Sequence, residues 1–200
     1  MKTLTEVEPR IAVNAVNTPG DANSVFQITS PGSYYLTGNV TGQPGKHGIE
    51  IEADGVTLDL SGFVLAGIAG TLDGIHAGYQ MAPRTNVSVR NGTVREWGGS
   101  GVNLGYSTYS VAHDLQASLN GADGLVAGSG SRVERCTADR NTGAGIVAGV
   151  GSTIVNCVAR GNDTGIVAVS SLFRGNTATN NGENINALGG STLVDNHAPF

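Results

Sequence analysis

The sequence is poor in aromatic residues, cysteine and charge. Of its 200 residues, 5% are aromatic and 14% are charged, and two are cysteines. So low an aromatic content argues against a globule built around aromatic side chains. The net charge of -5 argues against nucleic acid as the main partner. No run of 18 apolar residues occurs, so we expect no membrane-spanning segment and no membrane partner.

The first residues also lack a targeting signal. The stretch from Met1 to Glu8 contains no apolar core of the kind found in signal peptides, so we expect none in this chain. The protein is then cytoplasmic, unless a leader has been removed, in which case it is extracellular. The two cysteines do not decide the compartment.

Glycine, in contrast, is abundant, with 31 residues, and several glycines open a repeat. Openings at Gly124, Gly145 and Gly165 lie 21 and then 20 residues apart, and each continues as an aliphatic residue, valine and alanine. A second block follows. It starts with an apolar residue and has small or amide residues three, five and eight positions after that residue. Its members are Val133, Cys136, Ala138 and Asn141, then Ile154, Cys157, Ala159 and Asn162, then Phe173, Asn176, Ala178 and Asn181. A repeat of this length indicates a solenoid.

The repeat is typical of β-structure without helices. Each opening is a short strand whose alternate residues point inward. The second block bends between two short strands and is rich in Gly, Ser, Thr and Asn, which are poor helix formers. The framework of the leucine-rich repeat, which has a similar period, is absent. We therefore predict an all-β, single-stranded parallel β-helix of about six or seven coils, stacked about 4.8 Å apart.

Two kinds of side chain recur at fixed positions of the coil. One position holds asparagine four times, at Asn120, Asn141, Asn162 and Asn181. We predict a stacked turn in which these amides bond from coil to coil, with a row of ligands as the alternative.

The two cysteines also share one position. Cys136 and Cys157 lie on adjacent coils, within disulfide reach, but side-by-side stacking does not provide the dihedral angle that a disulfide needs. We predict two buried free thiols.

Residues 1–47 do not follow the repeat. Val25–Ile28 and Tyr34–Leu36 are expected to form strands joined by a Pro-Gly turn, and Ile11–Val13 a further strand. Because a solenoid needs an atypical end unit, we predict an N-terminal β cap over residues 1–47 and coils over residues 48–200, within one structural domain. Openings at Gly48, Gly74 and Gly101 are 26, 27 and 23 residues from the next one, so the early coils should carry loops.

The Gly-Ile-x-Ala opening, followed by Val-x-x-Cys/Asn-x-Ala-x-x-Asn, resembles the repeat of the pectate-lyase-like superfamily over about residues 48–198. The resemblance implies a right-handed β-helix, in agreement with the general preference for right-handed crossovers. That superfamily contains polysaccharide lyases, glycoside hydrolases, uronate epimerases, phage tailspikes and non-catalytic surface proteins. The resemblance therefore leaves the function open.

The known catalytic signatures of the superfamily are absent from the sequence. The Asp-Asp and Gly-His-Gly motifs of polygalacturonase-like members do not occur, nor does the Asp-Pro-His signature of alginate epimerases. Pectate-lyase-type elimination uses Ca²⁺, held by acidic oxygens, and an arginine base. The nearest candidates for these roles are Arg135, Arg160, Asp139 and His113. We expect Ca²⁺ only if the chain is a lyase, and otherwise no cofactor and no metal site.

The same charged residues fit an ordinary solvated surface. One outward position stacks His113, Glu134, Val155 and Arg174, and the next stacks Asp114, Arg135, Asn156 and Gly175. Opposite charges then lie on neighbouring strands, which favours paired surface charges over a catalytic site.

A second group lies near the early loops. His47, Asp73 and His76 could form a site, although surface histidines without a partner at a defined spacing are the preferred interpretation. The single tryptophan, Trp97, could stack on a sugar ring, but packing against the side of the β-helix is the preferred interpretation.

The outward face of the first strand is apolar. If Leu125, Ile146 and Ile166 point inward, then Val126, Val147 and Val167 point outward and stack on one another. His76, Asn103 and Asn186 occupy the equivalent positions in other coils. A face without charges favours a lateral oligomer interface, and the alternatives are a face covered by the N-terminal segment or a small patch without function.

The expected function is accordingly a non-catalytic β-helix scaffold that self-associates, as a trimer rather than a dimer, and that could present a surface to polysaccharide. The alternative is a carbohydrate-active enzyme of the polysaccharide lyase or epimerase type, acting on an acidic polysaccharide.

Overall fold

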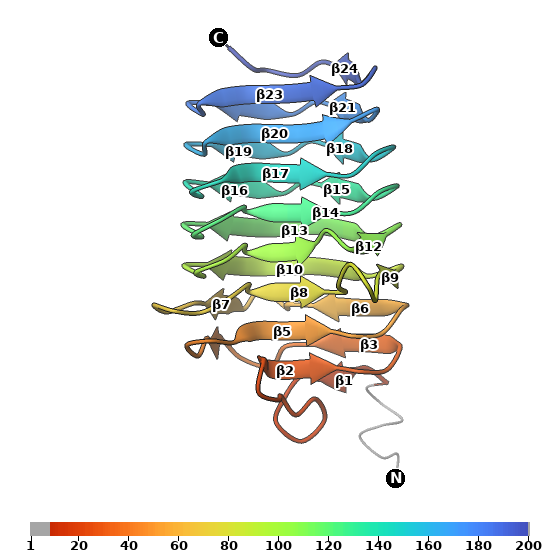
Figure 1. Ribbon diagram of the computed structural model, residues 1–200, viewed down its shortest axis with the longest axis vertical. Coiled ribbons are helices and arrows are strands. Elements are labelled where there is room, and N and C mark those ends of the chain that lie inside the picture. The colour runs from red at the N-terminus through yellow and green to blue at the C-terminus, as the bar shows by residue number, and fades with distance from the viewer. Residues whose placement is uncertain (1–8, 200) are drawn as a thin grey trace.

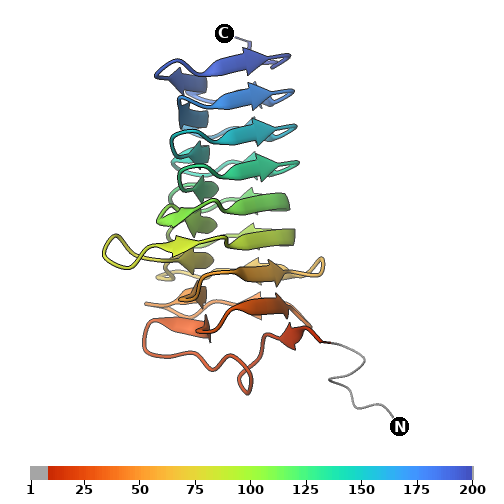
Figure 2. The same cartoon turned by 90° about the vertical axis from the view of Figure 1, so that its right-hand side faces the viewer.

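The computed structural model describes residues 9–199, which form a rod of stacked coils that rises from the N-terminal to the C-terminal end (Figure 1). In the side view of Figure 2, the strands of successive coils lie above one another, so each sheet extends along the length of the rod. These residues contain no α-helix. Accordingly, nothing in the described part of the chain is a helix able to cross a bilayer.

The coils build two large parallel sheets and one small one. The eight-stranded sheet consists of β2 (Ser24–Ile28), β5 (His47–Ile51), β8 (Ile75–Ala77), β11 (Val102–Leu104), β14 (Leu125–Ala127), β17 (Ala144–Ala148), β20 (Thr164–Val169) and β23 (Glu183–Leu188). The fourteen-stranded sheet follows the path β1 (Ile11–Ala12), β3 (Gly32–Tyr35), β6 (Val56–Asp59), β10 (Ser88–Arg95), β13 (Val111–Ser118), β15 (Arg132–Glu134), β18 (Thr153–Val155), β21 (Leu172–Arg174) and β24 (Thr192–Val194). Beside this path it contains β4 (Val40–Thr41), β7 (Val64–Ala66), β16 (Thr137–Asp139), β19 (Val158–Arg160) and β22 (Thr177–Thr179). The small sheet pairs β9 (Arg84–Thr85) with β12 (Ser107–Thr108).

The predicted all-β parallel β-helix is confirmed, and so is its register. Leu125 pairs with Ile146 and Ile146 with Ile166, and all three are buried. Their neighbours Val126, Val147 and Val167 pair in the same order and are only partly buried. Alternate residues of each short strand therefore face the core and the outside, as the period of two requires.

The bend inside the second block has a clear backbone cause. The residues at the equivalent position of four successive coils are all in the left-handed region, with φ of 56° for Asp114, 50° for Arg135, 54° for Asn156 and 62° for Gly175. One such residue bends the chain sharply, and at Arg135, Asn156 and Gly175 the bend separates two strands of the same sheet, whereas β13 continues through Asp114. The bend thus presents the side chains of Asp114 and Arg135 on the outside of the rod.

The solenoid has about eight coils rather than six or seven, because the first coil lies within residues 1–47. β2 is parallel to β5, and β3 is parallel to β6, so the strands on either side of the Pro-Gly turn belong to different sheets. Together they form one turn of the solenoid at its N-terminal end. The predicted strand at Ile11–Val13 is present as β1, which pairs with β3.

Trp97 lies in the core of the early coils, with 1% of its surface exposed. Its ring fills the space beside three glycines: a Cβ atom at Gly42, Gly48 or Gly74 would lie within 2.9 Å of a ring atom. Its Nε1 donates a hydrogen bond to the carbonyl oxygen of Leu65 at 3.2 Å. The ring is therefore part of the packing and is closed to a sugar, so the structure supports the preferred interpretation of Trp97 as a packing residue and not the sugar-stacking alternative.

The side chains that recur along the solenoid are bonded from coil to coil. Nδ2 of Asn120 donates to Oδ1 of Asn141, Asn141 donates in the same way to Asn162, and Asn162 to Asn181, over 2.9 to 3.0 Å. Cys136 and Cys157 are both free and buried, as predicted.

Candidate functional site

The outward residues of the eight-stranded sheet form one continuous row, here called the outer row. Paired from coil to coil, its members are Gln27, Glu50, His76, Asn103, Val126, Val147, Val167 and Asn186. The row changes character along its length, from titratable and amide side chains in the early coils to valines in the later ones. Its early half is the candidate functional site.

Six residues make up this site, which we call the outer-face cluster. Glu50, His76 and Asn103 come from the outer row, His47 begins β5, Asp73 precedes β8 and Tyr79 follows β8. Although they stand on an outward face, Glu50, Asp73 and His76 are buried, with 2%, 9% and 6% of their surface exposed. Titratable groups so well removed from water are uncommon unless they are paired.

Asp73 is the most extensively bonded member of the outer-face cluster. Its Oδ1 accepts a hydrogen bond from the backbone N–H of Ser100 at 2.7 Å, and its Oδ2 accepts one from Nδ2 of Asn103 at 3.1 Å. Oδ2 also lies 2.8 Å from Nδ1 of His76. Burial alone would raise the pKa of the Asp73 carboxyl group, but the bonds from His76, Ser100 and Asn103 outweigh it and lower the pKa. Asp73 is therefore a carboxylate.

An ionised Asp73 sets the tautomer of His76. The carboxylate can only accept, so Nδ1 of His76 carries the shared proton, and in the neutral ring Nε2 keeps a free lone pair. This Nε2 is buried and has no hydrogen-bond partner. An imidazole held through Nδ1 by a carboxylate, with Nε2 available, is the arrangement of a general base.

His47 has the opposite tautomer. Its Nδ1 lies 3.1 Å from the backbone N–H of Asp73 and accepts from it, so the proton of the neutral ring is on Nε2. Burial, followed by the nearby His76, lowers the pKa of His47. The rings of His47 and His76 are 4.4 Å apart, centroid to centroid, at 32°.

Glu50 and Tyr79 form the other side of the outer-face cluster. The hydroxyl group of Tyr79 donates to Oε1 of Glu50, and the Tyr79 ring lies 4.7 Å from the ring of His76. Burial and then the bond to Glu50 raise the pKa of Tyr79, so its hydroxyl group keeps its proton. The second oxygen of Glu50, Oε2, is buried and has no hydrogen-bond partner.

Tyr79 comes from an exposed turn. Its backbone exchanges two hydrogen bonds with Ala82, and 38% of its own surface is exposed, while Met81 at the tip is 94% exposed. The Tyr79 ring thus packs against His76 from a turn whose tip faces solvent.

The predicted catalytic candidates lie elsewhere, on the fourteen-stranded sheet, where they pair with each other. Nε of Arg135 lies 2.8 Å from Oδ1 of Asp114, whose Oδ2 is 2.7 Å from Nδ1 of His113. The bond from Arg135 and then that from His113 lower the pKa of Asp114. These exposed ion pairs occupy the charged groups of the face, as the alternating charges predict.

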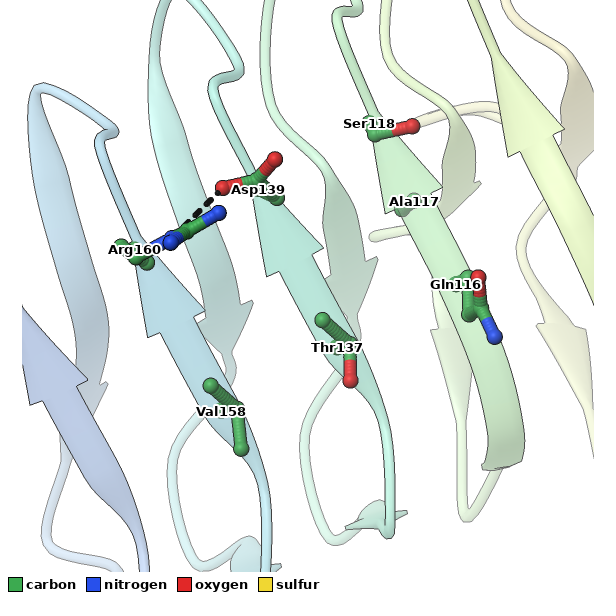
Figure 3. Close-up of a pocket in the computed structure, with 7 residues that line it drawn as sticks. All are labelled: Gln116, Ala117, Ser118, Thr137, Asp139, Val158 and Arg160. Carbon is green, nitrogen blue, oxygen red and sulfur yellow. Dashed lines mark hydrogen bonds and ion pairs between the residues drawn. The ribbon is translucent and has the colours of Figure 1, made fainter.

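Asp139 and Arg160 line a surface pocket of about 360 Å³ across β13, β16 and β19 (Figure 3). Asp139 accepts from Nε of Arg140 at 2.8 Å and from Nε of Arg160 at 3.0 Å. The remaining lining residues are Gln116, Ala117, Ser118, Thr137 and Val158. With its one carboxylate held by two arginines, this pocket offers neither a free base nor the pair of carboxylates that glycoside hydrolysis requires.

Comparison with known proteins places the chain in a family. Residues 24–183 match the family described as "Right handed beta helix region". The chain belongs to this family. No curated protein sequence matches this right-handed β-helix.

The solved structures similar to this right-handed β-helix include two from Azotobacter vinelandii. The A-module of mannuronan C-5 epimerase AlgE4 has 19% identity and a TM-score of 0.69, with 92% of this chain and 65% of that chain covered. The A-module of mannuronan C-5 epimerase AlgE6 has 18% identity and a TM-score of 0.67, with 94% of this chain and 64% of that chain covered. The chain thus spans just under two-thirds of their length, and at this identity the likeness shows the fold.

The interpretation of His47 and His76 as unpartnered surface histidines is wrong, although a signal for the site exists in the sequence. His47-Gly48-Ile49-Glu50 and Asp73-Gly74-Ile75-His76 are the same frame in consecutive coils. In both, the positions directly before the glycine and directly after the isoleucine are titratable, so the stacking of coils brings four such groups together. Tyr79 gave no such signal, because its place depends on the turn that follows β8.

Proposed function

We propose that this β-helix is a carbohydrate-active protein that removes a proton from the carbon next to a carboxylate in an acidic polysaccharide. This step is shared by uronate epimerases and polysaccharide lyases. The observation that carries the proposal is the Asp73–His76 pair, whose carboxylate fixes the neutral ring in the tautomer that has its lone pair on Nε2. The two similar A-modules, which belong to mannuronan C-5 epimerases, support a uronan as the substrate.

The outer-face cluster supplies both groups that the reaction needs. Nε2 of His76 takes the C5 proton of a uronate, while Asp73 holds the imidazolium that forms. Tyr79, which keeps its proton beside Glu50, is the acid. Protonation of C5 on the opposite face gives an epimer, and protonation of the departing O4 oxygen gives an unsaturated product. A positioned general base contributes about 10² to 10⁴ in rate.

Solvent exchange tests this proposal most directly. Mannuronan, guluronan and pectate are incubated with the protein in D₂O, and NMR follows deuterium at C5 together with any epimer or unsaturated end. Wild type should incorporate deuterium into at least one of them, and His76→Gln should lose at least a hundredfold in rate. His113→Gln is the matched control, because it removes an equivalent histidine–aspartate pair from the other sheet. Absence of exchange with all three uronans, or full exchange in His76→Gln, would overturn the proposal.

A second candidate function is a self-associating scaffold, and the valines of the outer row favour it. Val126, Val147 and Val167 stack on adjacent strands, and their row continues as Asn103 and Asn186, without a charge. A second copy of this chain, packed side by side, would cover this stripe. We favour a closed trimer over a dimer. In such an assembly the early half of the outer row stays available for polysaccharide.

A further inference from the structure

Three members of the outer-face cluster have the composition of a metal site. His47, Asp73 and His76 each offer one donor atom, and these three atoms lie within 4.8 Å of one another. Oδ2 of Asp73 is 2.8 Å from Nδ1 of His76 and 3.8 Å from Nδ1 of His47. Tetrahedral zinc, with bonds of about 2.0 to 2.2 Å, places its donors about 3.4 Å apart, so the two distances bracket the required one.

The donor types select the class of ion. Two imidazoles and one carboxylate suit Zn²⁺ and the neighbouring divalent transition metals, whereas Ca²⁺ and Mg²⁺ prefer oxygen donors throughout. The set therefore differs from the Ca²⁺ site that the lyase alternative implied. Three protein donors leave the fourth position of a tetrahedral ion open.

A buried atom without a partner points independently to a ligand. Oε2 of Glu50 is buried and makes no hydrogen bond within the described residues. Glu50 pairs directly with His76 across the strands, and 98% of its surface is removed from water, since 2% is exposed. Leaving a buried carboxylate oxygen without a partner is costly, and a nearby cation offsets that cost.

The charges of the outer-face cluster agree with this reading. Asp73 and Glu50 bring two buried carboxyl groups, and Nδ1 of His47 has a lone pair, which the backbone N–H of Asp73 now occupies. A divalent ion would balance two carboxylates. It would take the place of the proton that Asp73 and His76 share, which would leave to water or move to Nε2 of His76, and it would replace the Asp73 N–H as the partner of Nδ1 of His47.

We propose that His47, Asp73 and His76 bind a divalent transition metal of the zinc class, with Glu50 or water as the fourth ligand. Binding of the ion does not depend on the proposed function. Its consequence does rest on it: an ion in this position holds His76 and Asp73, so the loaded protein cannot abstract a proton. The site would then be switched off by zinc and restored by a chelator.

Calorimetric titration of the chelator-treated full chain with Zn²⁺, and the visible spectrum with Co²⁺, test the binding. We expect one ion per chain, a tetrahedral Co²⁺ spectrum, and at least a tenfold weaker affinity in His47→Gln and in Asp73→Asn. His113→Gln should bind as wild type does. If wild type gives no heat of Zn²⁺ binding, or a heat that does not fit one ion per chain, the proposed metal site is wrong. Unchanged affinity in both variants would also contradict it.

NMR keeps the test independent of whether the variants fold. On addition of Zn²⁺ to wild type, the imidazole signals of His47 and His76 should shift together, while those of His113 and His197 stay in place. Shifts of His113 or His197 alone would count against the site. Zinc binding without any exchange of uronan protons would end the proposed function and keep the metal site, whereas exchange without zinc binding would do the reverse.

Discussion

Oδ2 of Asp73 lies 2.8 Å from Nδ1 of His76, and this contact decides which nitrogen of the histidine is free. The pair spans the start of β8, with Gly74 and Ile75 between its members. The chain holds a second histidine–aspartate pair, His113 and Asp114, at 2.7 Å on the other sheet. That pair is exposed and engaged by Arg135, so the difference between the two lies in their surroundings and not in their geometry.

Asp73→Asn tests whether the orientation of the His76 ring matters, because the variant keeps the ring and changes only the partner of its Nδ1. The amide that replaces the carboxylate can donate to Nδ1, which would place the ring proton on Nε2 and remove the base. We expect C5 exchange in D₂O to fall by about 10² to 10⁴ while the fold is kept. Asp114→Asn is the control, and equal losses in both variants would contradict the role of Asp73.

Tyr79→Phe should allow removal of the C5 proton but slow the protonation step that forms the product. The base is kept, so deuterium should still enter C5, while the epimer or the unsaturated product should form at least tenfold more slowly than exchange. The same variant leaves both oxygens of Glu50 without a partner among the described residues, which should lower the free energy of unfolding by about 1 to 3 kcal/mol. NMR and thermal melting measure the two effects. Parallel loss of exchange and product would show that Tyr79 is not the acid.

Gly74→Ala should damage both the core and the outer-face cluster, because Gly74 stands between them. A Cβ atom there would lie 2.4 Å from Cγ1 of Val94 and 2.9 Å from Nε1 of Trp97. We expect about 1 to 3 kcal/mol of destabilisation from overpacking, measured by denaturant unfolding. Gly38→Ala is the control, since its Cβ atom would have no neighbour within 4 Å. Equal stability of the two variants would contradict this packing.

The sequence predicts the fold well because the fold is a repeat. Inward residues such as Leu125 and Ile146, and the stacked Asn120 and Asn141, follow from one period applied again and again. The repeat cannot predict the position of a residue that has no equivalent in the other coils. Trp97 follows a longer early coil, and only the three-dimensional packing shows that glycines from other coils leave room for its ring.

The sequence predicts the outer-face cluster only in part, for a related reason: it offers His47, Asp73 and His76 as a possible site but favours surface histidines without partners. A single coil shows one histidine with one acidic neighbour, and the chemistry arises only when two coils are stacked in the correct register. The predicted catalytic candidates Arg135 and Arg160 instead form ion pairs with Asp114 and Asp139. The catalytic motifs that the sequence lacks are those of other superfamily members. The sequence signal for this site is instead the frame around Gly48 and Gly74, which places titratable residues at the same positions of two consecutive coils.

Asp59 should make stability depend on pH at the acid end. Its Oδ1 accepts from the backbone N–H of Ser61 and from Nδ2 of Asn91, and its Oδ2 lies 3.1 Å from Nη2 of Arg90. Burial would raise the pKa of Asp59, but these bonds together lower it. A lowered pKa in the folded state stabilises the protein above the unfolded value, about pH 4, and this contribution is lost as the pH falls through the folded value. The difference in melting temperature between wild type and Asp59→Asn should therefore be largest near neutral pH and shrink below about pH 4, and a constant difference would contradict the assignment.

Val147→Lys tests self-association through the valine stripe. Val147 is the middle of three valines on strands about 4.8 Å apart, and its side chain faces outward, so a lysine there leaves Ile146 and the core unchanged. Complete burial would contribute at most about 1.5 to 3 kcal/mol for each valine, which is already partly buried, and this does not exceed the cost of association, so neighbouring residues must join the interface. We expect light scattering to report an assembly for wild type and a monomer for Val147→Lys, with equal melting of the isolated chains. Lysine at the exposed position 150, Val150→Lys, is the control for added charge. A monomeric wild type, or an assembly that tolerates a lysine at position 147, would rule out this interface.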